Sequence, residues 1–264
     1  MATDDVLAHY TGEALAERIL EAARAAGVHP LTPAALAPAD QFHMGGLRAT
    51  RELARLAGVG PGDRVLDLGC GLGGPARVLA AEFGCEVTGV DLSPEFVRSA
   101  AVLTEACGLG ERAAFRVADA TALPFADASF DVVFTQHVVM NIADRRAFWS
   151  EAYRVLRPAG RFAFFDVIRG PNPAEPAYPL PWARDPSISF LLDAAATRAL
   201  LEEVGFDIEA WNQPAPPAGR PDTTSPFSLR TVMGAGMEER VANIAACMAD
   251  GRLGLLQGVC RRPA

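Results

Sequence analysis

Short apolar runs alternate with amphipathic stretches along most of this chain, from about residue 64 onward. Runs that are apolar throughout, such as residues 130–135, predict strands buried in a parallel sheet, whereas apolar residues spaced three and four apart predict helices. This βαβαβ succession predicts an α/β fold with a doubly wound, mostly parallel sheet of seven strands and helices on both faces. The strands are expected at residues 64–68, 86–90, 113–117, 130–135, 161–167, 206–212 and 253–260.

The first 60 residues carry helical spacing without a strand pattern. One helix is expected from Thr11, a candidate N-cap, to Gly27, and a second one through residues 47–57. Three prolines between these helices predict that residues 28–38 wrap around the fold without a helix of their own. The expected division is an N-terminal helical lid at residues 1–60, a core at residues 61–264, and an insertion in that core at about residues 170–190.

A glycine-rich turn follows the first expected strand, in the stretch Asp67-Leu68-Gly69-Cys70-Gly71-Leu72-Gly73-Gly74. Glycines let the backbone bend sharply and let a ligand approach the main chain, and the helix that follows offers unpaired N–H groups. Gly69, Gly71 and Gly74 satisfy the GxGxxG spacing, so a dinucleotide enzyme is one candidate. Asp67 would oppose a pyrophosphate but suits the ammonium and sulfonium groups of S-adenosylmethionine. A turn that serves only strand–helix packing is the third interpretation.

Two more aspartates follow the next expected strands. Asp91 closes the second strand, about 20 residues beyond the glycine turn, where a carboxylate can accept both hydroxyls of a ribose. Asp119 follows the third strand, and the Asp119-Ala120 step is placed to meet an adenine amino group, with Leu92 and Leu123 beside the ring. The alternative for Asp119 is an ordinary loop cap. Because the carboxyl ends of parallel strands converge, these aspartates predict one ligand site.

Together these stretches resemble the class I S-adenosylmethionine-dependent methyltransferases over nearly the whole chain. The likeness extends to the runs at residues 87–94, 123–125, 129–133 and 154–160. It implies a Rossmann-like methyltransferase fold and S-adenosylmethionine as the cofactor, but it says little of the methyl acceptor. The expected cofactor-binding residues are Asp67, Gly69, Cys70, Gly71, Gly73, Asp91, Leu92, Asp119, Ala120 and Gln136.

The segment Asp40-Gln41-Phe42-His43-Met44-Gly45-Gly46 resembles the sarcosine and dimethylglycine N-methyltransferases, a group close to the sterol and quinone C-methyltransferases. The resemblance implies that Gln41, Phe42 and His43 fold over the methyl donor and contact the acceptor. It favours methylation of nitrogen on a small amine or an amino-acid-like molecule. The alternative is C- or O-methylation of a natural-product acceptor, such as an isoprenoid, a phenol or a polyketide.

The fourth expected strand is followed by Gln136-His137-Val138-Val139-Met140-Asn141. The Asn/Asp-Pro-Pro-Tyr/Phe motif of DNA and protein-glutamine methyltransferases is absent from this position. We expect Gln136 to face the methionine moiety, and His137 and Asn141 to face the acceptor. A histidine with a pKa near neutral can remove a proton during transfer, so His43 and His137 are the candidate bases. Hydrogen bonding to nearby backbone groups is the alternative for each histidine.

Trp182 lies in the proline-rich stretch at residues 170–186. Its ring is a candidate for packing on the acceptor or for holding a cation over its face, and packing at the rim of the site is the alternative. No cluster of metal-ligand spacing is visible, so we expect no metal. Transfer from a sulfonium needs alignment and exclusion of water more than a metal or a covalent nucleophile.

The composition of the chain limits the classes of partner that we expect it to bind. The formal charge of −8 argues against a broad grip on nucleic acid or on an anionic membrane, which leaves a small-molecule acceptor. Five scattered cysteines, with no signal-peptide pattern and no long apolar run, predict a cytoplasmic protein. Homodimerisation stays open. A non-catalytic module that keeps the cofactor site and an NAD-dependent enzyme are the more distant alternatives.

Overall fold

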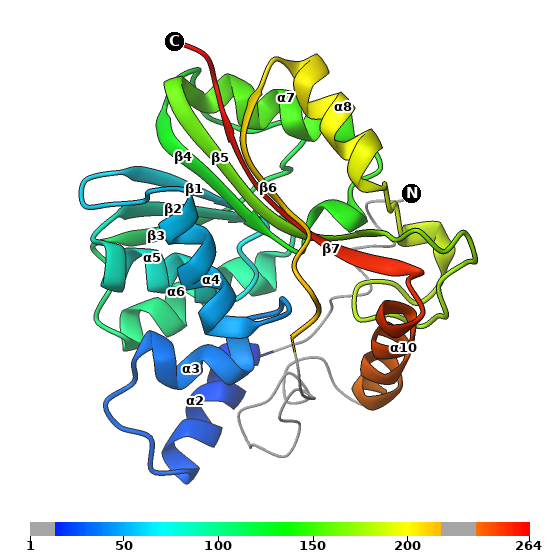
Figure 1. Ribbon diagram of the computed structural model, residues 1–264. Coiled ribbons are helices and arrows are strands. Elements are labelled where there is room, and N and C mark those ends of the chain that lie inside the picture. The colour runs from blue at the N-terminus through cyan, green and yellow to red at the C-terminus, as the bar shows by residue number, and fades with distance from the viewer. Residues whose placement is uncertain (1–13, 218–235) are drawn as a thin grey trace.

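The chain is built around one sheet of seven strands, as the computed structural model in Figure 1 shows. The structure describes residues 14–217 and 236–264. The strand order is β3-β2-β1-β4-β5-β7-β6; β7 runs antiparallel to both of its neighbours, β5 and β6, and the other neighbouring pairs are parallel. The predicted α/β fold with a mostly parallel, seven-stranded sheet is confirmed. The strands are β1 Arg64–Leu68, β2 Glu86–Asp91, β3 Ala113–Val117, β4 Phe130–Gln136, β5 Leu156–Arg169, β6 Asp207–Asn212 and β7 Leu253–Arg261.

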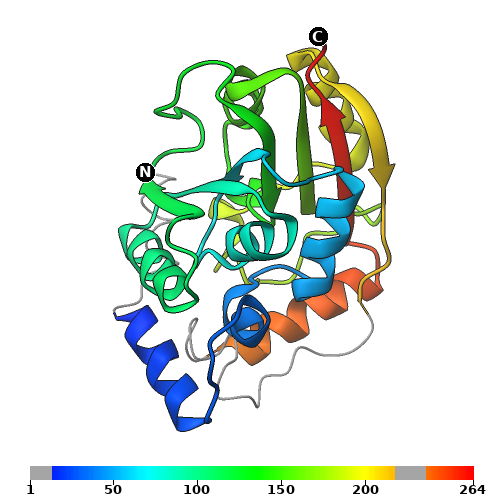
Figure 2. The same ribbon diagram turned by 90° about the vertical axis from the view of Figure 1, so that its left-hand side faces the viewer.

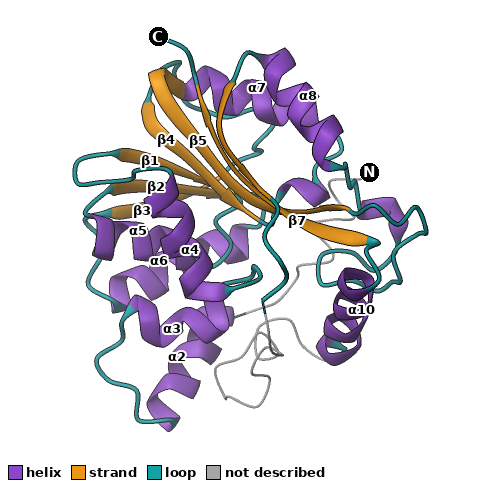
Figure 3. Ribbon diagram, viewed as in Figure 1, coloured by secondary structure: helices purple, strands orange, loops and turns teal. Residues whose placement is uncertain are grey.

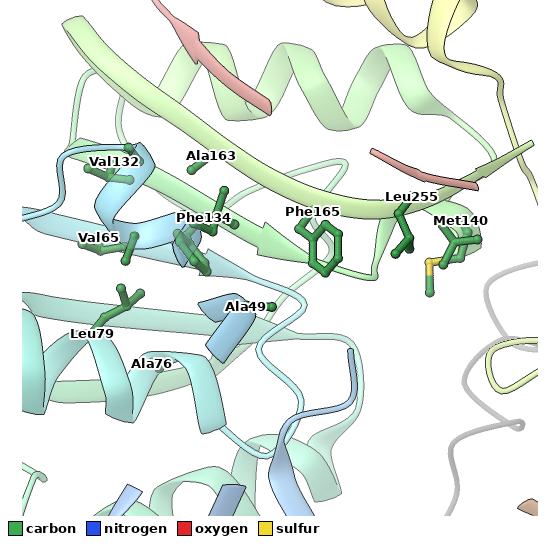
Figure 4. Close-up of a cluster of buried hydrophobic side chains, with 14 of the residues drawn as sticks. Ala49, Val65, Ala76, Leu79, Val132, Phe134, Met140, Ala163, Phe165 and Leu255 are labelled. Atoms are coloured by element: carbon green, nitrogen blue, oxygen red, sulfur yellow. The ribbon is translucent and has the colours of Figure 1, made fainter. Parts of the chain in front are cut away.

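Helices cover both faces of the sheet (Figure 3). Side chains alternate along a strand, so Val65 of β1 packs on one face and its neighbour Leu66 on the other. Phe134 and Phe165 share the face of Val65 (Figure 4), which also carries the side chains of Asp67 and Gln136 by the same alternation. This face packs on α4 Gly46–Leu56, α5 Gly74–Phe83 and α10 Met237–Ala249, and the opposite face packs on α7 Arg145–Val155 and α8 Ala194–Val204.

Two N-terminal helices extend this arrangement at one end (Figure 2). Helix α2, Leu15–Ala25, packs on α6, Pro94–Ala106, and helix α3, Pro33–Asp40, packs on α5. Buried apolar side chains from α2, α3 and α6 join in one cluster with Leu72 of the glycine turn. The N-terminal helices therefore rest on the part of the core that holds the turn. Members of the cluster include Leu15, Ile19, Leu36, Leu72, Phe96 and Leu103.

Helix α3 corrects the prediction that residues 28–38 form no helix. Thr32 caps it, since its Oγ1 accepts a hydrogen bond from the Ala35 N–H at 3.1 Å, and Pro33 occupies the first turn, where a missing N–H costs nothing. Pro38 lies inside the helix and removes a single backbone hydrogen bond, two residues before the helix ends. The prolines were read as breakers, but the first of them starts the helix.

The ends of the other helices and strands differ less from the predicted ones. The expected start of α2 at Thr11 lies outside the described residues, which begin the helix at Leu15. Strand β5 is longer than the predicted 161–167, because it pairs with β7 from Arg161 to Arg169 and also pairs at Leu156 with Phe130 across an irregularity. The segment at residues 170–190 contains a single 3-10 turn, Pro186–Ile188, and otherwise follows an irregular path.

Candidate active site

The glycine turn is fastened to the end of β2. The N–H groups of Gly69 and Cys70 both donate to the Val90 carbonyl, at 2.8 and 2.9 Å. Gly69 has a φ of +70°, and a Cβ there would lie 2.4 Å from Cγ2 of Val138, so only glycine fits. Gly73, with a φ of +76°, is the N-cap of α5. The turn therefore brings the ends of β1, β2 and β4 together, as the predicted site requires.

Asp91 braces this turn from β2. Its Oδ2 accepts a hydrogen bond from the Gly71 N–H at 3.0 Å, and its Oδ1 accepts one from the Ser93 N–H at 2.9 Å. Burial raises the pKa of Asp91 above its ordinary value. Each carboxylate oxygen has more than one lone pair, so both oxygens keep capacity for a further donor. Contact with a ribose stays a prediction.

Asp67 is the buried acidic group of the site. It is 2% exposed, and its Oδ2 has no hydrogen-bond partner among the described residues. Burial, and then the charge of Asp91, raise the pKa of Asp67 to about 7. A buried carboxyl oxygen without a partner is costly in the free protein, and a ligand cation would remove that cost. The ammonium group of S-adenosylmethionine fits this environment, whereas a pyrophosphate does not.

The remaining predicted cofactor residues surround these carboxylates. Oδ1 of Asp119 accepts hydrogen bonds from the N–H and Oγ1 of Thr121, at 2.8 and 2.7 Å, so Asp119 caps its own loop, and its contact with adenine stays a prediction. Ala120 is buried and Leu92 is partly exposed. Cys70 is buried, and burial raises the pKa of its thiol, which makes it a small packing residue of the turn and not a thiolate nucleophile.

Residues 40–46, here called the cover segment, lie directly on the glycine turn. A Cβ on Gly71 would come within 3.2 Å of the Phe42 ring, and a Cβ on Gly74 would meet the Asp40 carbonyl oxygen at 2.5 Å. The Arg77 guanidinium of α5 donates to Oδ2 of Asp40 at 2.6 Å and to the Leu72 carbonyl at 2.7 Å. One arginine thus ties the cover segment to the turn.

His43 of the cover segment belongs to a buried hydrogen-bond cluster. Its Nε2 lies 2.8 Å from Oε1 of Gln41 and 3.0 Å from Oγ1 of Thr50. The same Thr50 hydroxyl donates toward Oε1 of Gln136, at 2.9 Å. Burial lowers the pKa of His43 to about 4, so the ring is neutral at physiological pH. The structure brings together Gln41, His43 and Gln136, which the sequence analysis assigned to the site from distant segments.

His137 follows β4 in a left-handed conformation, with a φ of +53°. Its N–H donates to the Phe165 carbonyl at 2.8 Å, and its ring lies 5.1 Å from the Phe165 ring and 6.0 Å from the His43 ring, between centroids. Its Nε2 is buried and has no partner among the described residues. Burial, and to a smaller degree His43, lower the pKa of His137 well below its ordinary value. His137 is therefore a neutral ring with a free nitrogen.

Asp166 holds the turn that carries His137. Its Oδ1 accepts hydrogen bonds from the N–H groups of Val138 and Val139, at 2.9 and 3.2 Å. Asp166 and Thr50 are not among the site residues predicted from the sequence. Asp166 lies at the carboxyl side of β5, the same strand-end signal that marked Asp67 and Asp91. Thr50 gave no such signal, because a threonine on the apolar face of a helix resembles any other buried threonine.

Asn141 and Trp182 join the segment at residues 170–190 to the site. The Asn141 side chain donates to the carbonyls of Trp182 and Ile188, at 2.9 and 3.0 Å. Trp182 is 2% exposed, lies in the core cluster of the site face, and donates from Nε1 to Oγ of Ser189 at 3.1 Å. These contacts are packing contacts, and contact of either side chain with an acceptor stays a prediction.

Among the described residues, no group of three or more His, Cys, Asp or Glu side chains is placed to hold a metal ion. No helix within residues 14–217 or 236–264 combines the length and the apolar character needed to cross a membrane.

This chain is similar to known methyltransferases in sequence. Residues 66–164 match the family model described as "Methyltransferase domain". The chain is 42% identical over 128 residues to 27-O-demethylrifamycin SV methyltransferase of Amycolatopsis mediterranei, covering 47% of each chain. It is 34% identical over 133 residues to sterol 24-C-methyltransferase of Eremothecium gossypii, covering 50% of this chain and 36% of that protein. The chain thus spans less than half the length of these curated relatives.

The fold is also similar to that of a solved structure, phosphoethanolamine N-methyltransferase 2 of Haemonchus contortus in complex with S-adenosylmethionine. The TM-score is 0.72 at 22% identity, over 90% of this chain and 59% of the other. The glycine turn, the unpaired Asp67 carboxyl oxygen and the strand order agree with the family match. Residues 66–164 thus match a methyltransferase domain, and the chain is similar to methyltransferases over about half of its length.

Proposed function

We propose that this chain transfers the methyl group of S-adenosylmethionine to a nitrogen atom of a small amine or an amino-acid-like molecule. Two observations support the transfer: within the described part of the chain, neither the buried Oδ2 of Asp67 nor the buried Nε2 of His137 has a hydrogen-bond partner. The first suits the cationic methyl donor, and the second suits a nucleophile that presents an N–H or O–H group. When bound, S-adenosylmethionine supplies a methyl group on a sulfonium that is already activated for displacement.

The residues of this chain then have separate tasks. Asp67 receives the ammonium group of the donor, Asp91 receives the ribose hydroxyls, and Gln136 faces the methionine moiety. His137 accepts a hydrogen bond from the acceptor through Nε2, which directs the lone pair of the nucleophile toward the methyl group. As the new bond to carbon forms, the carbon–sulfur bond breaks and its electron pair stays on sulfur. The proton of the nucleophile then leaves through His137 to water.

The preference for nitrogen rests on two supports. The cover segment resembles the sarcosine and dimethylglycine N-methyltransferases, and a neutral His137 is a hydrogen-bond acceptor for an amine. A hydroxyl group would donate a hydrogen bond to His137 equally well, so O-methylation is the second candidate. A carbon nucleophile offers no proton to Nε2 before attack, which makes C-methylation the less suitable third candidate. The relatives named above include N-, O- and C-methyltransferases.

Exclusion of water is assigned to two parts of the chain. We propose that residues 1–60 act as the lid on the donor side, because the cover segment packs on the glycine turn through Phe42. Residues 170–190 are proposed as the acceptor side, because Asn141 holds them next to the turn after β4. Closing both sides would strengthen electrostatic contacts within the site and keep the donor from hydrolysis.

The test is a screen with methyl-labelled S-adenosylmethionine against matched panels of small amines, phenols and isoprenoids. The proposal predicts labelled product with members of the amine panel and formation of S-adenosylhomocysteine in equal amount. Labelled phenol or isoprenoid without labelled amine would overturn the preference for nitrogen. Donor binding without any labelled product, in these panels and in a broad metabolite extract, would favour the non-catalytic alternative.

A further inference from the structure

A single buried hydroxyl joins the cover segment to the sheet. Thr50 of α4 is fully buried, and its Oγ1 lies within 3.0 Å of three polar side-chain atoms. Two of them, Gln41 Oε1 at 2.8 Å and His43 Nε2 at 3.0 Å, come from the cover segment. The third, Gln136 Oε1 at 2.9 Å, comes from the end of β4. Helix α4 and the cover segment before it therefore meet the end of β4, which is distant in sequence, at one oxygen atom.

The number of available protons limits which of these contacts can be hydrogen bonds at the same time. A hydroxyl has one proton to donate and two lone pairs, and a neutral imidazole has one N–H and one lone pair. If His43 carries its proton on Nε2, it donates to Gln41 Oε1 at 2.8 Å, and the Thr50 proton goes to Gln136 Oε1. The Gln136 amide then donates to Nδ1 of His43 across 3.4 Å. If the proton is on Nδ1 instead, it donates to the Met44 carbonyl oxygen at 3.2 Å, and Nε2 accepts the Thr50 proton at 3.0 Å. In either tautomer both ring nitrogens of His43 are engaged.

The two histidines of the site are therefore different in kind. Both ring nitrogens of His43 have partners, whereas Nε2 of His137 has none among the described residues. A nitrogen already committed to a buried hydrogen bond is a poor proton acceptor, because taking a proton would break the bond and leave a buried partner unpaired. This separates the two candidate bases of the sequence analysis.

We propose that Thr50 is a positioning residue, whose hydroxyl holds Gln136 of the core and His43 of the cover segment in one hydrogen-bonded cluster. In this cluster His43 is a structural hydrogen-bonding group and not a base. The inference rests on the proposed function for its activity readout and deepens it, since it leaves His137 as the histidine that faces the acceptor. Removal of the hydroxyl would remove the 2.9 Å hydrogen bond between α4 and Gln136 and leave the 3.4 Å contact of Gln136 with Nδ1 of His43.

Thr50→Val is the informative variant, because valine keeps the shape of threonine and lacks the hydroxyl. Thr50→Ser restores the hydroxyl and is the conservative rescue. Thr197→Val is the matched control: Thr197 is 4% exposed, and its Oγ1 donates to the Asp193 carbonyl at 2.7 Å in α8, on the opposite face of the sheet. Melting temperature, kcat and KM are measured for all three variants.

We expect Thr50→Val to lower kcat roughly tenfold, the change expected when a buried polar group loses its partner at the reacting centre. Thr50→Ser should recover most of kcat, and Thr197→Val should change the melting temperature without changing kcat. Wild-type kcat in Thr50→Val, or no recovery in Thr50→Ser at unchanged melting temperature, would overturn the proposal.

A second readout is independent of methyl transfer. Nitrogen NMR of histidine-labelled protein reports the protonation state and tautomer of each ring. The proposal predicts that wild-type His43 stays neutral and in one predominant tautomer down to about pH 5, and that Thr50→Val changes the tautomer balance or raises the pH of titration. An unchanged His43 spectrum in Thr50→Val would refute the cluster even in an active enzyme. A changed spectrum in a protein without methyltransferase activity would instead refute only the proposed function.

Discussion

Nη2 of Arg77 lies 2.6 Å from Oδ2 of Asp40, and both side chains are shielded from solvent. The same guanidinium donates to the carbonyls of Leu72 and Ala100 and to Oγ1 of Thr104. This ion pair connects the cover segment, the glycine turn and α6, whereas the other ion pairs described here are substantially more exposed. It holds the donor side of the site together from within the core.

Loss of this ion pair should lower the free energy of unfolding. Asp40→Asn leaves a buried guanidinium without its counter-charge, which costs about 3–5 kcal/mol in comparable cases, and it should also weaken donor binding because the turn loosens. The measurement is urea unfolding at pH 7 with and without S-adenosylmethionine. Glu82→Gln is the control, because the Arg51–Glu82 pair is about one-third exposed and should contribute less than about 1 kcal/mol. Equal losses in the two variants would contradict this role.

The affinity for S-adenosylmethionine should depend on pH through Asp67. The pKa of Asp67 is about 7 in the free protein, and a cationic donor binds the ionised carboxylate better than the protonated one. Affinity should therefore fall as the pH drops below about 7, by up to about tenfold per pH unit. Titration calorimetry between pH 5.5 and 8.5 measures this. Asp67→Asn should bind more weakly at pH 8 and show a flat profile, and an unchanged slope in that variant would exclude Asp67 as the titrating group.

Asp166 should make the free protein less stable as the pH rises. Its pKa is raised from 3.8 to about 7, chiefly by burial, with Arg145 and two backbone N–H groups opposing the rise. A raised folded-state pKa stabilises the fold below the unfolded pKa, and this contribution is lost as the pH rises through about 7. Asp166→Asn keeps an oxygen for the N–H groups of Val138 and Val139 and removes the buried charge.

The variant should gain stability relative to wild type between pH 5 and pH 8, by roughly 2–4 kcal/mol for a shift of this size. Thermal unfolding of both proteins at these two values tests the sign. A variant that loses stability as the pH rises, relative to wild type, would show that the carboxylate is stabilised in the ionised form.

Two substitutions at His137 can separate the effect of its backbone conformation on stability from the effect of its ring on turnover. At a φ of +53°, asparagine is tolerated and a β-branched residue is not. His137→Asn should keep the melting temperature within a few degrees and lower kcat at least about tenfold, because the ring nitrogen is lost. His137→Val should lower both. Turnover in His137→Asn equal to wild type would remove His137 from the mechanism, whatever the stability of the variant.

The sequence predicted the sheet and the position of the glycine turn well because both depend on local patterns. Apolar runs located all seven strands, and the glycines with Asp67 and Asp91 marked the strand ends that face one site. The α3 helix was missed because Pro33 was read as a breaker, although it stands at the first helical position after the Thr32 cap. In each case the result followed from residues that lie close together along the chain.

The acceptor side was less predictable because it depends on contacts across the fold. Trp182 is buried by the path of residues 170–190, which no local pattern encodes. The importance of Thr50 arises from its meeting with Gln136, which lies 86 residues away in sequence. The distinction between His43 and His137 likewise required the partners of each ring nitrogen, which only the folded chain brings together.

Titration of wild type and Asp91→Ala with S-adenosylmethionine, S-adenosylhomocysteine and NADH tests whether the glycine turn binds the methyl donor. We predict that wild type binds the first two and not NADH, and that Asp91→Ala binds both at least about tenfold more weakly, because the carboxylate that holds the turn and meets the ribose is lost. Binding of NADH without S-adenosylmethionine, or equal donor affinity in the Asp91→Ala variant, would contradict this prediction.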